Sequence, residues 1–216
     1  MDKKKLIGLI IGVLMFIALI SGATFAWLTL TANFTNNAIT GSSRDFTFTY
    51  ASGTAVSDLV WTTSSPPRNV IAESKGYITV SATKAAKIPE ASSFKIILKK
   101  DTMDIKVADL VKYAVCRSNT ASECSNEATT TIPTTVGGNW VSIGSITTET
   151  GDQILYDDTT TFNVYSETKS VTGNYYVYLW LDSAVLTNDN FNDAHGKQIV
   201  GYVYAEAEQG ENGTVQ

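Results

Sequence analysis

The segment 175–181 constrains the fold of this chain more than any other stretch of its sequence. Its side chains alternate between two sets, as the side chains of a β-strand do. Both sets are apolar: Tyr175, Val177, Leu179 and Leu181 form one, and Tyr176, Tyr178 and Trp180 form the other. A strand that is apolar on both faces needs protein on both sides of its sheet. We therefore expect 175–181 to be a central strand that is covered on each face.

Other segments show the same alternation or a short apolar run, and helical periodicity is scarce. They are rich in β-branched and aromatic residues, which fit a pleated surface. The expected strands are 46–50, 77–82, 94–98, 110–116, 140–146, 162–165 and 200–206. Turn signals separate them at 51–53, 65–67, 137–139, 172–174 and 195–197. About eight or nine short strands predict an all-β sandwich or barrel, and only 101–111 favours a short helix.

The N-terminal segment has the three parts of a secretory signal peptide. Lysines at positions 3–5 precede a run of apolar residues and Gly over 6–20, and small residues lead to Ala26. We expect cleavage between Ala26 and Trp27. The alternative is an uncleaved anchor, because 6–28 is long enough to cross a bilayer core of about 30 Å with the lysines in the cytoplasm. Both interpretations predict an extracellular or cell-surface protein, or one anchored in the cytoplasmic membrane and facing out.

Composition argues against several function classes. The formal net charge is -5 and the pI is about 4.9, whereas nucleic-acid-binding proteins carry a basic face. One His and two Cys cannot supply the four ligands of the usual His/Cys zinc site. The sequence contains no HExxH, GxSxG, Walker or GxGxxG motif. We therefore expect no catalytic residue, no cofactor and no metal ligand, and a protein that is not an enzyme.

Two acidic segments were candidates for chemistry. Asp157 and Asp158 are neighbours, and neighbours on a strand point to opposite faces, which makes them poor partners for acid–base catalysis. The segment 188–193 offers Asn and Asp oxygens to Ca²⁺ but lacks the order of an EF-hand loop. We expect a solvated loop there, with His195 as a turn residue.

Cys116 and Cys124 are the two cysteines of the chain. In an exported protein an even pair is most simply a disulfide, and the spacing does not match a CxxC redox motif. We expect this bond to fix the start of a polar loop or decorated hairpin over 117–138. Closing so short a loop contributes about 2–3 kcal/mol to stability.

Aromatic residues gather in the last two strong strands. They are Tyr175, Tyr176, Tyr178, Trp180, Tyr202 and Tyr204. They fit a sandwich core with an aromatic ladder on one sheet face, where each cross-strand pair contributes about 0.2–1 kcal/mol. The alternative is a binding face, on which an exposed row stacks on sugars or packs against another subunit. The alternation alone does not decide which face is exposed.

Both ends of the chain resemble one known family. Gly22–Trp27 (GATFAW), directly after the apolar run, resembles the Gly-x-Thr-x-Ala-aromatic junction of SipW-dependent signal peptides. Such peptides precede the TasA and camelysin-like proteins of Gram-positive bacteria. The segments 36–41, 178–182 and 197–209 are similar to strands of that family. The resemblance covers the two ends of the chain and does not extend to its middle.

This resemblance implies a jelly-roll-like antiparallel β-sandwich that follows a hydrophobic signal or anchor helix. TasA subunits build biofilm fibres, in which an N-terminal segment of one subunit completes the sheet of the next. Here the candidate donor strand carries apolar residues in period two: Leu28, Leu30, Ala32 and Phe34. The alternatives are that this segment pairs with its own sheet or forms a stalk. The expected parts are a signal or anchor (1–26), an extended segment (27–41), a sandwich (42–208) and a flexible tail (209–216).

Three functions compete at this point. The first is an exported, non-catalytic cell-surface or biofilm-matrix protein that self-associates through its N-terminal segment into fibres. The second is a membrane-anchored binding module, held by residues 6–28, that uses the aromatic rows or the 182–195 loop to hold a glycan, Ca²⁺ or a host protein. The third, an enzyme of the camelysin kind, ranks last because the chain shows no recognised protease motif.

Overall fold

A computed structural model describes residues 39–43, 46–52, 59–73, 76–85, 92–118, 124, 129–162 and 170–209. The expected signal cleavage at Ala26 and Trp27 lies outside these residues. So do the expected donor strand, Leu28 to Phe34, and the tail beyond Gln209. Within the described part, no helix is both long and apolar enough to cross a membrane.

The described chain is mostly strand, with one short α-helix and two 3₁₀ turns. The first strands are β1 (Ile39–Ser43), β2 (Phe46–Ser52), β3 (Trp61–Thr62), β4 (Tyr77–Ala85) and β5 (Ser92–Met103). They are followed by β6 (Val111–Arg117), β7 (Trp140–Ser145), β8 (Gly151–Asp158), β9 (Ser170–Asp182) and β10 (Ile199–Gln209). The helix α2 (Arg68–Glu73) follows β3, and the 3₁₀ turns η1 (Ser183–Val185) and η2 (Phe191–Asp193) precede β10.

The strands form two sheets. The large sheet has the order β1-β2-β4-β9-β6-β7, and the short β3 pairs with the end of β9. The small sheet has the order β10-β5-β8. All strand pairs are antiparallel except β3 with β9. The β7–β8 connection therefore carries the chain from the edge of one sheet to the edge of the other.

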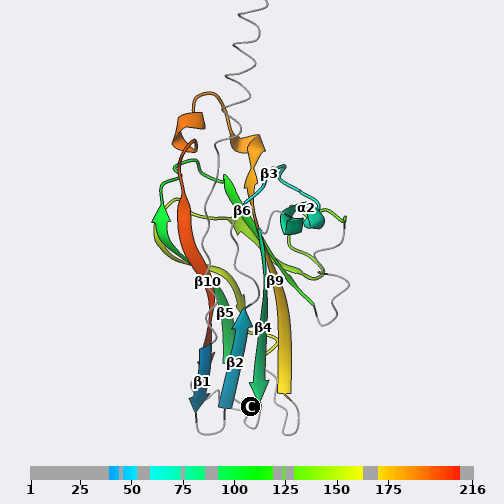
Figure 1. Ribbon diagram of the computed structural model, residues 1–216. Helices are drawn as coiled ribbons and strands as arrows, with labels where there is room; N and C mark the ends of the chain where they lie inside the picture. The colour runs from blue at the N-terminus through cyan, green and yellow to red at the C-terminus, as the bar shows by residue number, and fades with distance from the viewer. Residues whose placement is uncertain are drawn as a thin grey trace, which may run out of the picture.

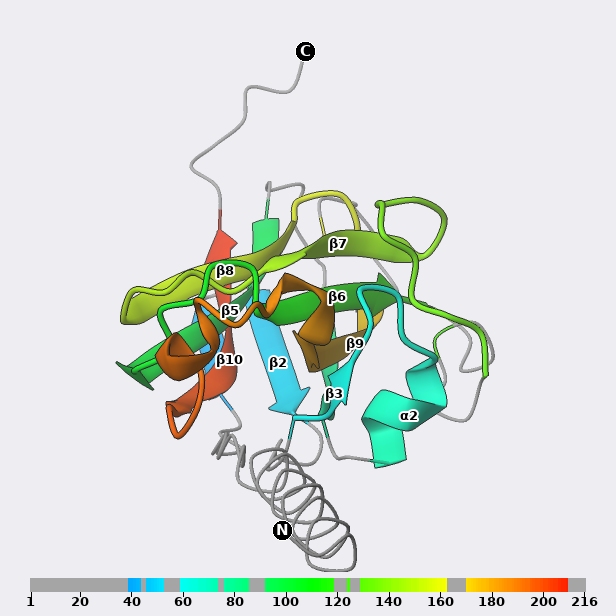
Figure 2. The same cartoon turned by 90° about the horizontal axis from the view of Figure 1, so that it is seen from above.

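The two sheets face each other across the main hydrophobic core, as Figures 1 and 2 show. The large sheet contributes inward side chains such as Val80, Val115 and Val177, and the small sheet contributes Leu98 and Val203. All five are nearly or fully buried. The molecule is thus a β-sandwich whose core is made by alternate residues of both sheets.

A second, smaller core covers the outer face of the large sheet. It consists of Ile71, Ala114, Cys116, Cys124, Ile132, Tyr178 and Trp180. Ile71 comes from α2, which lies on the side of the large sheet away from the small sheet (Figure 2). The strand β9 pairs with β4 and β6 and is buried on both faces, which confirms the prediction for 175–181.

Most of the expected strands are confirmed, but three local predictions are wrong. The segment 101–111 is not a helix: β5 runs to Met103, and burial then alternates, with Ile105 and Val107 inside. The expected turn at 172–174 is the interior of β9, where the Tyr175 hydroxyl lies against Gly173, 2.6 Å from where a Cβ would be. Phe162 follows β8 as a bend instead of starting a strand, and the rest of that segment lies outside the described residues.

Candidate binding face and sheet edges

The aromatic residues predicted from sequence end in three different environments. Tyr175 faces the main core, and Tyr178 and Trp180 belong to the second core. Tyr176 is half-buried beside that core. Tyr202 and Tyr204 alternate along β10 with the core residues Val203 and Ala205, so they lie on the other face of the small sheet. Both are half-buried, and Tyr202 also packs against the main core. Tyr176 is buried to a similar degree but stacks on Tyr77 beside the second core, so Tyr202 and Tyr204 are the partly exposed aromatic pair of the small sheet.

The outward side chains of the small sheet form three rows that cross its strands. Strand pairing aligns Tyr202 with Lys99 and Asp152, Tyr204 with Ile97 and Ile154, and Glu206 with Lys95 and Asp157. Asp101 extends the face beyond Lys99. We call these ten residues the tyrosine face. At a β-bulge opposite Ile96 and Ile97, β8 contains one extra residue, Leu155, whose side chain lies in the core. Because of this extra residue, Ile154 and Asp157 both lie on the outward face, in line with Ile97 and Lys95.

Contacts within the tyrosine face hold its two rings in place. The Lys99 Nζ lies 5.6 Å from the centroid of the Tyr202 ring. The rings of Tyr202 and Tyr204 are 5.8 Å apart at an interplanar angle of 51°. The Tyr204 hydroxyl donates to Asp152 Oδ2 over 3.3 Å. Because β5 separates β10 from β8, the Tyr204 side chain must cross β5 beside Ile97.

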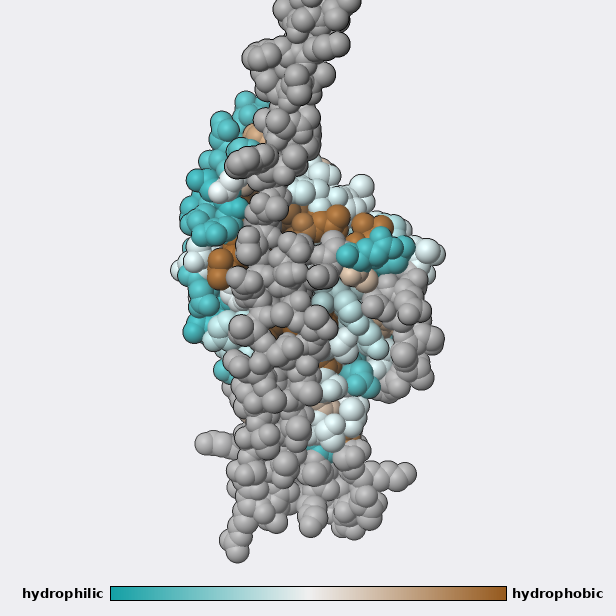
Figure 3. Space-filling model, in the orientation of Figure 1, coloured by the Kyte–Doolittle hydropathy of each residue, from teal (hydrophilic) through white to brown (hydrophobic). Residues whose placement is uncertain are grey.

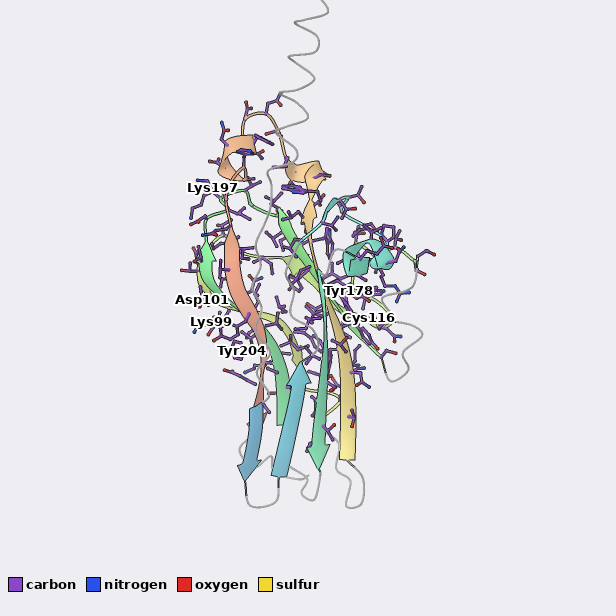
Figure 4. All side chains as sticks on the ribbon, in the orientation of Figure 1. Lys99, Asp101, Cys116, Tyr178, Lys197 and Tyr204 are labelled. Carbon is purple, nitrogen blue, oxygen red and sulfur yellow. A yellow bond between two sulfur atoms is a disulfide. The ribbon has the colours of Figure 1, made fainter. Side chains whose placement is uncertain are left out.

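The tyrosine face combines apolar surface with charge. Ile154 is 53% exposed in the middle row, although Ile97 beside it is only 4% exposed. Figure 4 shows Lys99, Asp101 and Tyr204 together on one flank, with Cys116 and Tyr178 on the opposite side. Hydrophilic colour dominates the same flank in Figure 3. The face is thus a small apolar centre between two charged rows.

Neighbouring groups shift the pKa values of Lys99 and Tyr204 on this face. The Tyr202 hydroxyl, followed by the carboxylates of Asp101 and Asp152, raises the pKa of Lys99 above its usual value. Burial raises the pKa of Tyr204 to about 12, and the neighbouring Glu206 and Asp152 add to this effect. At neutral pH the face therefore presents a charged ammonium at Lys99 and a neutral phenol at Tyr204.

No family model, curated protein or solved structure matches this chain. The resemblance at the two ends of the sequence thus stays an expectation.

The 182–195 loop uses its polar side chains to hold its own backbone. Asp182 accepts hydrogen bonds from the Ser64 hydroxyl (2.6 Å) and the Ala184 amide (3.0 Å). Asn190 Oδ1 accepts from the Thr187 amide over 2.7 Å. The His195 ring stacks on Phe191 with centroids 5.2 Å apart. Nowhere in the described part of the chain do three or more His, Cys, Asp or Glu residues gather as a metal site would require.

Sequence reasoning missed a buried carboxylate at Asp158. This side chain accepts hydrogen bonds from the Tyr175 hydroxyl (2.6 Å) and from the amides of Thr160 (3.0 Å) and Thr161 (2.7 Å). Arg117 Nη1 completes the cluster at 3.3 Å. The signal was present as an Asp followed by three Thr, which is typical of a turn closed by an Asp side chain. All its partners are structural groups, so we assign Asp158 to stability.

The structure joins Cys116 and Cys124 in a disulfide with an S–S distance of 2.02 Å. Cys116 lies on the central strand β6, and Cys124 is buried above the large sheet. The Tyr178 hydroxyl donates to the Cys124 carbonyl over 2.7 Å. The disulfide thus ties the β6–β7 connection onto the second core.

Four strands lie at the ends of the two sheets: β1 and β7 in the large one, β8 and β10 in the small one. Among the described residues, no strand pairs with the outer edge of β10, which is eleven residues long. It contains no Lys and no Pro, the residues that commonly protect an edge. β1, β7 and β8 are shorter, with five, six and eight residues, whereas β8 and β10 each carry a bulge and carboxylates. β10 therefore offers the longest of these four edges to another strand.

Proposed function

We propose that this protein is an exported, non-catalytic cell-surface or biofilm-matrix subunit that assembles into fibres by donor-strand addition. In this proposal the sandwich is jelly-roll-like and is released from the signal peptide 1–26, or stays anchored until release. The observation that carries the proposal is the long edge of β10, which pairs with no other described strand, in a chain that also contains an apolar segment of strand periodicity.

The physical basis of assembly is backbone pairing at that edge. An added strand gains main-chain hydrogen bonds, while alternate apolar side chains enter the core and set the register. Leu28, Leu30, Ala32 and Phe34 supply such an apolar set in the segment that cleavage after Ala26 frees. The disulfide fits this setting, since such bonds persist in oxidising compartments.

Variants of the donor segment test this proposal. Leu30→Asp and Phe34→Asp place a charge on the apolar side, whereas Thr31→Asp places the same charge on the polar side and serves as the matched control. We expect electron microscopy of matured protein to show fibres for the natural chain and Thr31→Asp, and none for the other two variants. Monomers alone at high concentration, after verified cleavage before Trp27, would contradict the proposal.

The tyrosine face supports a second candidate, the membrane-anchored binding module. Intact mass and N-terminal sequencing of protein taken from its own cells separate the two. A chain that begins at Trp27 favours the fibre subunit. A chain that keeps Met1 to Ala26 favours a sandwich tethered to the membrane through 6–28.

A further inference from the structure

Contacts between neighbouring side chains restrict the two tyrosines of the tyrosine face. The cation–π contact of Lys99, the contact between the two rings and the Tyr204–Asp152 hydrogen bond restrict both tyrosines. Restricted side chains lose little entropy when a ligand arrives, which favours binding. The Ile154 side chain on β8, beside the two tyrosines, stays accessible to a ligand.

The size of this face limits what can bind there. Three strands about 4.8 Å apart and five residues of β10 at about 3.4 Å each give a patch of about 10 by 14 Å. A stable protein partner usually covers about 800 Å² on each side, several times this area. The face by itself is therefore too small for a second copy of the chain and suits a small ligand.

The charge of the face limits the chemistry of that ligand. Two lysines, Lys95 and Lys99, stand against four carboxylates, those of Asp101, Asp152, Asp157 and Glu206. This excess of negative charge opposes anionic ligands such as phosphate polymers or uronic acids. Aromatic rings with carboxylates and an ammonium at their rim match a sugar, whose C–H face stacks on a ring and whose hydroxyls pair with the charged groups.

We propose that the tyrosine face binds a short neutral oligosaccharide, with Tyr202 and Tyr204 as the stacking platform. Lys99 donates to sugar hydroxyls, and Asp152 accepts from them. This proposal does not rest on fibre formation, because the rows lie on a sheet face and strand addition uses a sheet edge.

Calorimetry with defined sugars tests the proposal on the mature exported protein. The probes are trimers of β-1,4-linked glucose, β-1,4-linked N-acetylglucosamine and α-1,4-linked glucose, with trigalacturonate as the anionic comparison. We expect at least one neutral trimer to bind with a Kd below about 1 mM, and trigalacturonate to bind more weakly. Absence of binding by all three neutral trimers, or tighter binding of trigalacturonate, would overturn the proposal.

A matched pair of surface variants locates the site. Ile154 and Val136 are the two exposed large hydrophobic residues of the described chain, one on the face and one in the β6–β7 connection outside it. We expect Tyr202→Ala and Ile154→Asp each to weaken binding about five- to hundredfold, taking the free energy of one base–aromatic stacking contact as the scale. Val136→Asp is expected to leave the Kd unchanged. Equal affinities in all variants would place the sugar elsewhere and overturn the assignment.

Ultracentrifugation without sugar tests whether a second copy of the chain, and not a sugar, covers the tyrosine face. If the natural chain self-associates and Ile154→Asp alone abolishes this, a second copy covers the face and the sugar proposal fails. We expect Ile154→Asp and Tyr202→Ala to lose sugar binding but still to form fibres, because neither change touches the donor segment. The two proposals can therefore fail independently.

Discussion

At the scale of single residues, Asp158 is a buried carboxylate that four hydrogen bonds hold in place. Burial alone would raise the pKa of this carboxyl, but hydrogen bonds from Tyr175, Thr161 and Arg117 outweigh burial and lower the pKa below its usual value. Tyr175 is itself fully buried, and its hydroxyl is held by the same carboxylate. The cluster therefore ties the end of β8 to β9 and β6 across the core.

Replacement of this carboxylate is expected to be costly. Asp158→Asn removes the carboxylate that pairs with Arg117 and disturbs four hydrogen bonds, so we expect a loss of about 3 kcal/mol in the free energy of unfolding. Urea unfolding at pH 7 measures this loss. Asp157→Asn is the matched control, because Asp157 points outward, and it should change stability by less than about 0.5 kcal/mol. Equal losses in both variants would contradict the assigned role.

The same carboxylate predicts sensitivity to acid. A carboxyl with a lowered pKa in the folded state stabilises the protein above its unfolded pKa of about 3.9, and this stabilisation is lost as the pH falls through the folded pKa. We expect the stability gap between the natural chain and Asp158→Asn to be complete at pH 7 and to shrink below about pH 4. Urea midpoints measured across this range test it. A gap that stays constant into strong acid would contradict it.

Tyr204 reports on the tyrosine face directly. Its pKa of about 12 reflects burial first and the carboxylates of Glu206 and Asp152 next. Asp152→Asn removes one negative charge that opposes the phenolate, so the pKa should fall while staying above the ordinary value of about 10. NMR of the ring carbons against pH measures it. The control Asp189→Asn, in the 182–195 loop, should leave the pKa unchanged, and an unchanged pKa in Asp152→Asn would mean that this contact is not made.

At the scale of elements, period-two hydrophobicity predicted the strands because each sheet has one or two buried faces. Burial alternates along β4 and β10 as the sequence pattern does, whereas β9 is buried on both faces as its two apolar sets predict. The same rule explains the failure at 101–111: Met103, Ile105 and Val107 alternate with exposed residues, so the segment follows an extended path. The helix α2 was missed because six residues carry little helical signal, and its contact through Ile71 stabilises it instead.

The candidate site was only partly predictable for a related reason. Alternation separated the two faces of β10 but could not tell which one is exposed. The rows across the small sheet join residues from β5, β8 and β10, and their register depends on the bulges at Ile96/Ile97 and Val200/Gly201. No local sequence pattern predicts where such bulges occur or which residues they bring together. The Asp158 cluster likewise joins residues that lie far apart along the chain.

The disulfide acts on one element, the cover of the large sheet. We expect Cys116→Ser combined with Cys124→Ser to lower the free energy of unfolding by about 2–3 kcal/mol, the value for closing a short loop. Hydrogen exchange should then rise in β6 and around Tyr178, whose hydroxyl donates to Cys124, more than in β5 and β10. The small sheet serves as the internal control. Uniform acceleration in both sheets would show that the bond stabilises the whole sandwich instead of its cover.

At the scale of the whole molecule, the sandwich is an acidic body. The chain has 16 basic and 21 acidic residues, and removal of 1–26 removes three lysines and Asp2, which leaves 13 and 20, a net charge of -7. Copies of such a subunit repel one another as they approach. Assembly through a sheet edge depends on backbone hydrogen bonds and apolar contacts, which salt does not weaken. Repulsion and attraction in a fibre therefore respond differently to ionic strength.

This difference gives a prediction for the proposed fibre. The screening length falls from about 30 Å at 0.01 M salt to about 8 Å at 0.15 M, so added salt should remove most of the repulsion between incoming subunits. We expect fibre growth, followed by light scattering on matured protein, to accelerate severalfold over this range. Sucrose at matched osmolality is the control for a general effect of solutes. If growth slowed as salt was added, ion pairs between subunits would drive assembly, and the edge of β10 would not be its principal contact.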